Sequence, residues 1–219
     1  MAPKRTGPKL LAFDRKLGGR FVAGADEAGR GPLAGPLVVA GVLLDVESLR
    51  EHRARPLGLL NDSKQLDRDT REELYRAVVS CAARVSVHVF PPHVIDRDGL
   101  HKSNLRGLRA ALWACQPADV CVVDGFKLGP TAPVHRAVVD GDEKSAAIAA
   151  ASIVAKVTRD RYMQSADAIY PAYGFSSHVG YITPSHTRVV RERGPCEIHR
   201  RSWRARAYQT DEEPVAASV

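Results

Sequence analysis

Short apolar runs separated by glycine- and proline-rich turns recur along much of the chain. Their content of valine and other β-branched residues predicts strands over residues 21–26, 37–44, 85–90, 120–124 and 134–139. The turn between the first two runs is rich in glycine and proline, which favours a hairpin connection. These runs are enough for one substantial sheet.

Apolar residues at helical spacing predict helices over residues 67–83, 94–98, 104–114 and 145–162. Asp67 or Asp69 is a candidate N-cap of the first helix, and a last helix starts at Thr183 or Ser185 and ends near residue 193. The alanine-rich stretch 145–156 suits close packing on a sheet, and we expect it to serve packing alone. Strands and helices in a chain of 219 residues, 44% of them hydrophobic, predict an α/β fold with one main domain.

The two ends of the chain differ from its middle. Residues 1–19 are basic and rich in glycine and proline, so we expect a flexible N-terminal arm there, a main domain over residues 20–205 and a frayed tail over residues 206–219. The net charge is +7, and the excess of positive charge is concentrated in residues 1–20 and 188–206. Two basic ends around an acid-bearing middle favour a polyanionic partner, first of all nucleic acid, over a generally basic protein with solvated arginines.

Cysteine and histidine spacing argues against a zinc site and against a disulfide framework. The four cysteines are far apart and are expected to be free thiols in a reducing compartment: Cys81, Cys115, Cys121 and Cys196. We expect His178, His186 and His199 to serve packing or backbone contacts. The N-terminus lacks the apolar core of a signal peptide, and no run reaches transmembrane length, so the expected location is the cytoplasm, away from membranes.

Acidic residues follow three of the predicted strands. Asp26 and Glu27 end the first strand, directly before a Gly-Arg-Gly turn at residues 29–31, and Asp124 ends the fourth. Asp140 and Asp142 flank a glycine after the fifth strand. Carboxylates fixed at strand ends suit a shared cleft, and their hard oxygen ligands favour Mg²⁺ or Mn²⁺ over Zn²⁺. Three or four such acids suit two cations about 3.5–4 Å apart, with the glycine turn close to a phosphodiester.

Three points stay open at this level. Neighbouring strand residues point to opposite faces, so Asp26 and Glu27 reach one site only if the strand ends or bulges at Glu27. Residues 122–125 and 138–141 share one local pattern, so Asp140 is as good a candidate as Asp142. Asp124 taken alone also suits a turn-forming Asp-Gly pair.

Several longer motifs together resemble bacterial type 2 ribonuclease H, the ribonuclease HII family. They are GADEAGRG at residues 24–31, NDSKQL at 61–66, VDG at 123–125, GD at 141–142 and AAASIVAKVTRD at 149–160. YGF at 173–175, Gly180-Tyr181, Thr183, His186 and HRRS at 199–202 continue the pattern. The resemblance covers roughly residues 21–203, and its motifs follow one another in the family's order, which makes it specific.

The resemblance implies a ribonuclease-H-like mixed β-sheet flanked by helices, with a C-terminal helical extension, so that residues 20–205 form a catalytic domain. It implies a metal-dependent endoribonuclease that hydrolyses the RNA strand of RNA–DNA hybrids. It further implies incision 5′ of single ribonucleotides in duplex DNA, as in ribonucleotide excision repair. The implied mechanism uses two metal ions, Mg²⁺ or Mn²⁺, and leaves 3′-hydroxyl and 5′-phosphate ends.

The family's metal-binding acids fall, by this resemblance, on Asp26, Glu27 and Asp124. The family places its fourth ligand after the glycine, which selects Asp142. Asp140 stands where many relatives carry lysine, so this cleft is expected to be slightly less positive than theirs.

The Gly-Arg-Gly motif of the family falls on Gly29, Arg30 and Gly31. In the family it contacts the 2′-hydroxyl and adjoining phosphates mainly through its backbone, and the 2′-hydroxyl is what separates RNA from DNA. The tyrosine that stacks on the sugar at the RNA–DNA junction falls on Tyr181. Val179 replaces a frequent lysine, which removes one phosphate contact.

Three further polar residues are candidates for phosphate contacts. They are Ser63, Lys64 and Lys156, although a serine in this setting also suits a turn cap and each lysine also suits a solvated surface. Gln65 and Trp203 depart from the family pattern without touching the proposed metal-binding acids.

Two other functions remain as alternatives. A non-catalytic duplex-binding protein fits the basic ends and predicts salt-dependent binding without Mg²⁺-dependent products. A DNA junction resolvase of the same superfamily fits the acids but would ignore a single 2′-hydroxyl. We expect a monomer, and the sequence indicates no protein partner.

Overall fold

The computed structural model describes residues 5–49, 51–203 and 208. Its strands are β1 (Phe21–Ala28), β2 (Leu37–Asp45), β3 (Arg84–Phe90), β4 (Val120–Asp124) and β5 (Arg136–Val138). Its α-helices are α1 (Gly7–Arg15), α2 (Arg68–Cys81), α3 (Pro92–Asp98), α4 (Leu100–Ala114), α5 (Ala146–Ile169), α6 (Phe175–His178) and α7 (Pro184–Arg193). Short 3₁₀ helices lie at Glu51–Leu57, Ser63–Gln65, Gly141–Glu143 and Pro171–Tyr173.

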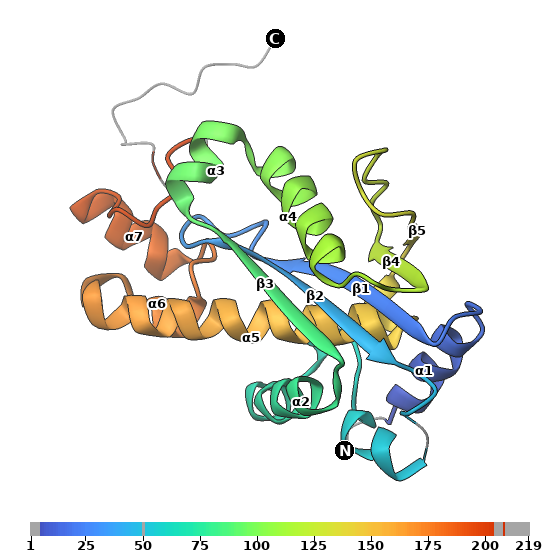
Figure 1. Cartoon of the computed structure of the whole chain (residues 1–219). Coiled ribbons are helices and arrows are strands. Elements are labelled where there is room, and N and C mark those ends of the chain that lie inside the picture. Colours follow the sequence, from blue (N-terminus) through green and yellow to red (C-terminus); the bar gives the residue numbers. More distant parts are fainter. Residues whose placement is uncertain (1–4, 50, 204–207, 209–219) are drawn as a thin grey trace.

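The strands form one mixed sheet in the order β3-β2-β1-β4-β5. β1, β2 and β3 pair antiparallel, as expected of a hairpin connection, while β4 and β5 run parallel to β1. The sheet is flanked by helices and followed by a helical C-terminal region, which confirms the predicted fold class (Figure 1).

The two faces of the sheet are covered by different helices because side chains alternate along each strand. Val38, Ala40 and Val42 of β2 pack with the alanine-rich part of α5, while Leu37 and Val39 pack with α4 on the opposite face. Figure 1 shows α4 and α5 on opposite sides of the sheet. The sheet is therefore held between two helical layers.

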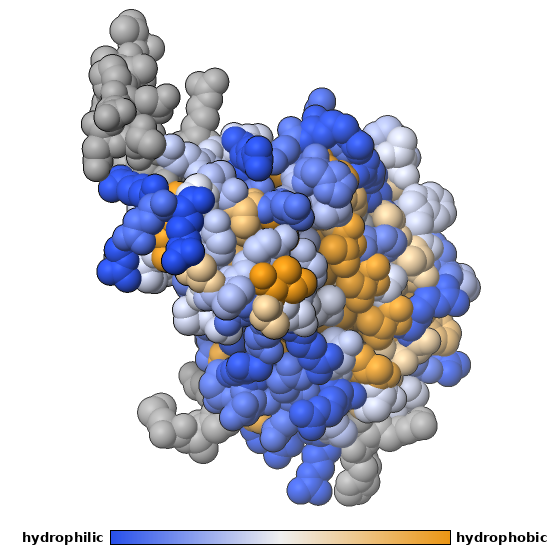
Figure 2. Space-filling model, turned by 90° about the vertical axis from the view of Figure 1, so that its left-hand side faces the viewer, coloured by the Kyte–Doolittle hydropathy of each residue, from blue (hydrophilic) through white to orange (hydrophobic). Residues whose placement is uncertain are grey.

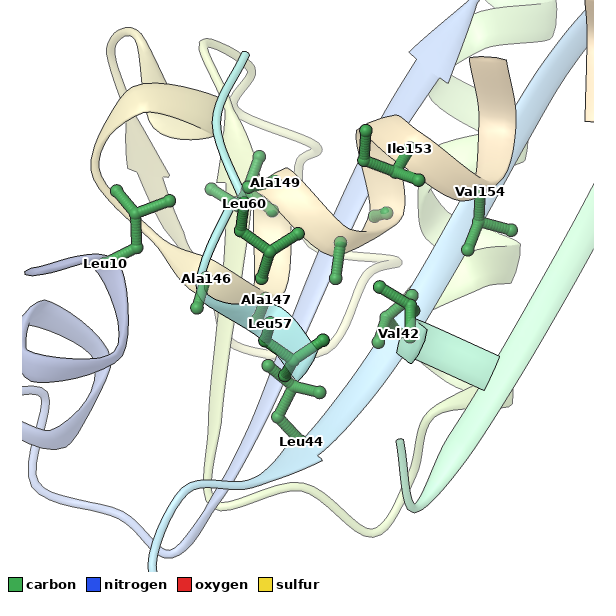
Figure 3. Close-up of a cluster of buried hydrophobic side chains, with 14 of the residues drawn as sticks. Leu10, Val42, Leu44, Leu57, Leu60, Ala146, Ala147, Ala149, Ile153 and Val154 are labelled. Carbon is green, nitrogen blue, oxygen red and sulfur yellow. The ribbon is translucent and has the colours of Figure 1, made fainter. Parts of the chain in front are cut away.

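The N-terminal segment that we expected to be a flexible arm contains a helix. In α1, Leu10 and Leu11 are buried, and Leu10 lies beside the first turns of α5 (Figure 3). Two leucines in a basic stretch rich in glycine and proline give too little periodicity to predict a helix. The burial of α1 comes from tertiary contacts with α5.

Most other predicted elements agree with the structure to within a few residues. Asp67 caps α2 and Thr183 caps α7, each accepting a backbone N–H three residues on. α5 is longer than predicted, β5 is shorter, and α6 was not predicted. The frayed tail predicted over residues 206–219 lies, apart from Tyr208, outside the described residues.

Gly24 marks the closest approach between β1 and α5. A Cβ atom there would lie 2.2 Å from the carbonyl carbon of Ala147 and 2.4 Å from the nitrogen of Ile148. These are backbone atoms, so α5 would have to move away from the sheet. We therefore expect Gly24→Ala to lower the free energy of unfolding by about 1–3 kcal/mol or more, measured by urea unfolding. Wild-type stability would contradict this close contact.

Asp14 of α1 is buried at the start of α5, where its Oδ2 accepts the N–H of Ala147 at 2.9 Å. Burial raises its pKa from 3.8 to about 6, although hydrogen bonds from Ser145 and Ala147 act in the opposite direction. The folded chain thus keeps a proton that the unfolded chain loses near pH 4, and the stability that this proton supplies is lost as the pH rises through about 6.

We expect Asp14→Asn to remove this pH dependence. Between pH 4 and pH 7, the free energy of unfolding of the wild type should fall relative to the variant by up to about 3 kcal/mol. Urea unfolding of both proteins across this range measures the difference. A difference that stays constant with pH would show that Asp14 does not titrate in this way.

β3 forms one edge of the sheet, and its Val87 and Val89 are exposed. Figure 2 shows an apolar stripe on an otherwise largely hydrophilic side of the molecule. Arg84 and His88 on the same strand are charged or polar, as is usual for edge strands that avoid unwanted pairing.

Among the described residues, no helix combines the length and the apolar character needed to cross a membrane.

Candidate active site

A pocket of about 330 Å³ lies at the end of β1. It is lined by all the site candidates of the sequence analysis except Asp140, and by three residues that were not candidates. The predicted ones are Asp26, Glu27, Gly29, Arg30, Gly31, Ser63, Lys64, Asp124, Asp142, Lys156 and Tyr181, and the additional ones are Ala28, Ser152 and Arg159. Segments far apart in the chain thus meet in one place.

The position of the pocket follows from the unequal lengths of β1 and β4. The two strands pair only as far as Ala25 and Val123, while β1 continues to Ala28. Beside the last residues of β1, the sheet is therefore open on the β4 side. The expected end or bulge of the strand at Glu27 is wrong, because Glu27 pairs regularly with Val39 of β2. Asp26 and Glu27 start from opposite faces and still line one pocket, because both lie at this opening.

Asp124 ends β4 directly beside the opening. Its Oδ1 accepts the N–H of Gly141 at 2.7 Å, which fixes the carboxylate. Asp142 follows in the 3₁₀ helix and is buried in the pocket, whereas Asp140 is exposed and lies 3.8 Å from the ammonium group of Lys144. The structure thus brings Asp142, and not Asp140, together with the other acids.

The crowded carboxylates hold their protons more firmly than isolated ones. Burial, and next the charge of Glu27, raise the pKa of Asp26 well above its usual range. Burial also raises the pKa of Glu27, against the opposing effect of Arg30. The pKa of Asp142 rises to about 6 because of burial and then because of the neighbouring carboxylate of Asp62. Positive charge placed among these groups would relieve their repulsion.

Two residues were missed from the sequence: Ser152, which lines the pocket, and Asp62, which acts on Asp142 and Lys64. Asp62 lies in the loop motif at residues 61–66, of which only Ser63 and Lys64 were predicted as site residues. Ser152 lies in the stretch of α5 expected to serve packing alone, yet its hydroxyl is 2.9 Å from that of Ser63 and lowers the pKa of Asp26 by hydrogen bonding. For Ser152, the expectation of a pure packing stretch is therefore wrong.

Asn104 of α4 acts on Glu27 and was also missed. It is fully buried, and its amide lowers the pKa of Glu27 by hydrogen bonding. Neither polar atom of its side chain completes a hydrogen bond of normal geometry, and Oε2 of Glu27 is likewise buried without a partner. A helical asparagine with ordinary spacing gives no signal of this role in the sequence.

Two lysines bring positive charge to the pocket. Burial acts most strongly on the pKa of Lys64 and lowers it, but the summed attraction of the surrounding acids, led by Asp62 and Asp142, raises it above the ordinary value. Lys156 is half-buried and donates to Asp160 at 2.8 Å. Burial lowers the pKa of Lys156 despite this ion pair. Both lysines line the pocket together with the acids.

The Gly-Arg-Gly turn and Tyr181 form another wall of the pocket. The guanidinium of Arg30 lies 3.4 Å from Glu27 and 5.0 Å from the centre of the Phe126 ring. Tyr181 is 44% exposed, so its ring is free to meet a bound molecule. Val179, two residues before it, has a φ of 43°, which is strained for a β-branched residue.

The three histidines serve packing and backbone contacts, as predicted. Nδ1 of His186 hydrogen-bonds the carbonyl of Tyr181 at 2.8 Å, and its Nε2 lies 3.0 Å from Nε2 of His199. His178 stacks on His186 and bonds the carbonyl of Tyr173. Among the described residues, Cys81, Cys115, Cys121 and Cys196 form no disulfide with one another.

The acids fit divalent cations, although not as a closed cage. Within the described part of the chain, no group of three His, Cys, Asp or Glu side chains is tight enough to enclose a metal ion. Mg²⁺ is commonly held by one or two carboxylates, with waters and substrate phosphates completing its shell. The unpartnered Oε2 of Glu27 and the mutual repulsion of the acids are the features that such a cation would satisfy.

Comparison with known proteins gives consistent matches. The family model described as Ribonuclease HII matches residues 23–206. A ribonuclease HII from Nocardia farcinica is 47% identical over 184 residues, which cover 84% of this chain and 71% of that protein. The matched region contains every residue that lines the pocket.

Solved structures agree with this result. The ribonuclease H2 of Pyrococcus horikoshii OT3 superposes with a TM-score of 0.72 at 28% identity and covers 86% of this chain and 95% of that one. The RNase HII of Archaeoglobus fulgidus, solved as a complex with PCNA, gives a TM-score of 0.71 at 29% identity, with 85% and 96% covered.

Proposed function

The chain belongs to the ribonuclease HII family, whose members are endoribonucleases acting on RNA–DNA hybrids, and from this premise we propose that it also incises duplex DNA at single embedded ribonucleotides. The observation that carries the proposal is the pocket itself. It joins four carboxylates from three segments of the chain to a Gly-Arg-Gly turn and an exposed tyrosine. The carboxylates suit phosphodiester hydrolysis, and the turn and the tyrosine suit recognition of one sugar.

In this proposal, Asp26, Glu27, Asp124 and Asp142 would hold two divalent cations, Mg²⁺ or Mn²⁺. When bound, the cations would activate the attacking water and stabilise the leaving oxygen. The water gives up a proton as its oxygen forms a new bond to phosphorus, the bond from phosphorus to the 3′ oxygen breaks, and the 3′ oxygen takes up one proton, so that the water's two hydrogens are divided between the two products. The products are a 3′-hydroxyl and a 5′-phosphate, with the cut on the 5′ side of the ribonucleotide.

The other residues of the pocket would bind and orient the substrate. Lys64 and Lys156 bring positive charge near the acids and suit the neighbouring phosphates, and Ser63 is held by Ser152 for the same purpose. Tyr181 would stack on the sugar that follows the ribonucleotide. All of these residues come from one chain, so we propose that a monomer is sufficient for activity.

The test is a cleavage assay on two DNA duplexes that differ in a single 2′-hydroxyl. We expect a nick 5′ of the ribonucleotide in Mg²⁺ or Mn²⁺, no nick in the all-DNA duplex, and no product in EDTA. Binding without metal-dependent product would favour the non-catalytic alternative. Equal cleavage of both duplexes would favour a junction-resolving nuclease and overturn the proposal.

A further inference from the structure

Two arginines close to the pocket are buried without a carboxylate partner. Arg159 of α5 is 1% exposed, and Arg200 in the C-terminal segment is 0% exposed. Among the described residues, neither forms an ion pair within 4.0 Å, although Asp160 and Asp96 act on them from further away. Arginine is rarely buried to this degree without an acid, so some other group must satisfy these guanidinium groups.

Arg200 directs its donors to the backbone of the loop between β1 and β2, residues 29–36, which carries the Gly-Arg-Gly turn. Its Nη2 donates to the carbonyl of Gly29 at 2.6 Å, its Nη1 to that of Arg30 at 3.2 Å and its Nε to that of Gly35 at 3.0 Å. Burial, and next the repulsion from Arg159, lower the pKa of Arg200 to about 9. Arg200 therefore stays charged at neutral pH and bonds three carbonyl groups of one loop.

Arg159 bonds the far end of the same loop from another direction. Its Nε donates to the carbonyl of Pro36 and its Nη2 to that of Ala34, both at 3.0 Å. Its guanidinium also lies 5.9 Å from the centre of the Tyr181 ring. The two arginines, from α5 and from the C-terminal segment, thus hold the loop at five carbonyl groups.

The orientation of these carbonyls decides where the amide hydrogens of the turn point. In a planar trans peptide, the C=O of one residue and the N–H of the next point in opposite directions. Bonds from the buried Arg200 to the carbonyls of Gly29 and Arg30 therefore turn the N–H groups of Arg30 and Gly31 away from the protein interior. Among the described residues, neither of these N–H groups has a hydrogen-bond acceptor.

We propose that Arg159 and Arg200 are positioning residues for ribonucleotide recognition, because they fix the loop so that the amide hydrogens of Arg30 and Gly31 are presented to the 2′-hydroxyl. This inference rests on the proposed function. Two positive charges behind the peptide units also polarise them, which strengthens the outward N–H groups as donors. Arg30, the arginine within the turn, instead points to Glu27 and Phe126.

The test measures binding separately from cleavage. Arg159→Lys and Arg200→Lys keep the positive charge, but a single ammonium group cannot bridge several carbonyls as a guanidinium does. Affinity for a DNA duplex with one ribonucleotide, and for the same duplex without it, is measured by fluorescence anisotropy with Ca²⁺ in place of the catalytic ion. We expect the preference for the ribonucleotide duplex to fall by about tenfold in each variant, with all-DNA affinity within about twofold of wild type.

The matched control is Arg161→Lys, the same substitution on the same helix. Arg161 lies at the surface and pairs with Glu72. The Arg161→Lys variant should therefore show the same preference for the ribonucleotide duplex as the wild type. Circular dichroism and thermal unfolding establish that each variant is folded. If Arg200→Lys does not fold, Arg159→Lys decides the question.

The outcomes separate the inference from the proposed function. An unchanged preference in the folded variants, or an equal loss of affinity for both duplexes, would overturn the positioning role. A wild-type protein that binds both duplexes equally would overturn ribonucleotide recognition itself, before any variant is considered. The assignment is supported if Arg159→Lys and Arg200→Lys lose the preference for the ribonucleotide duplex and Arg161→Lys keeps it.

Discussion

Asp124→Asn is expected to reduce nicking at an embedded ribonucleotide by about 10³-fold while leaving the fold intact. Asp124 ends β4 beside the open edge of β1, and its charge raises the pKa values of Asp26, Glu27 and Asp142. It therefore lies at the electrostatic centre of the acids. Asparagine retains the shape and the oxygen that accepts the N–H of Gly141, but it removes one unit of negative charge.

The loss should therefore appear in catalysis and in metal binding, and not in stability. The thermal midpoint of Asp124→Asn is expected to equal or exceed that of the wild type, because one source of repulsion is removed. Titration with Mn²⁺ should show weaker binding. Asp140→Asn is the matched control, since Asp140 has a similar sequence setting shortly after β5 but is exposed and paired with Lys144. Nicking by Asp124→Asn at the rate of the control would refute the assignment of Asp124.

The sheet and the positions of Asp26, Glu27 and Asp124 were predictable because they depend on local patterns. Apolar runs of strand length stand out in the sequence, and the acids at their ends lie where the chain leaves the sheet. The side chains of neighbouring parallel strands then meet at one edge, which brings Asp26 and Asp124 together. The choice of Asp142 over Asp140 could not follow from local pattern. It depends on a 3₁₀ turn that buries one acid and exposes the other.

The residues that support the site could not be predicted, because their role depends on tertiary contacts. Ser152 looks like part of an alanine-rich packing stretch until α5 is placed against β1 and the 61–66 loop. Arg200 and Arg201 are consecutive arginines in a basic segment, and no periodicity indicates that the first is buried and the second exposed. Asp14 of α1 is a third case, since its burial and its hydrogen bond exist only because α1 packs at the start of α5.

Gly29→Ala is expected to have the second large effect, on stability and on recognition together. Gly29 has a φ of 96°, and a Cβ atom there would lie 2.3 Å from Nε of Arg159 and 2.6 Å from the carbonyl oxygen of Pro36. The substitution would thus strain the backbone and break the bond between Arg159 and the loop. We expect a loss of about 3 kcal/mol or more in the free energy of unfolding.

Gly31→Ala, two residues away in the same turn, is the matched control for stability. A Cβ atom at Gly31 would have its nearest neighbour in the Tyr181 ring, at 3.7 Å, which is an ordinary contact. Gly31 also does not share the positive φ of Gly29. Urea unfolding should therefore show near wild-type stability for Gly31→Ala and a large loss for Gly29→Ala. Because the strained loop can no longer present its amide hydrogens, Gly29→Ala should also lose its preference for the ribonucleotide duplex at temperatures where it is folded. Equal stability of the two variants would mean that the loop is not held as tightly as its contacts with Arg159 and Arg200 indicate.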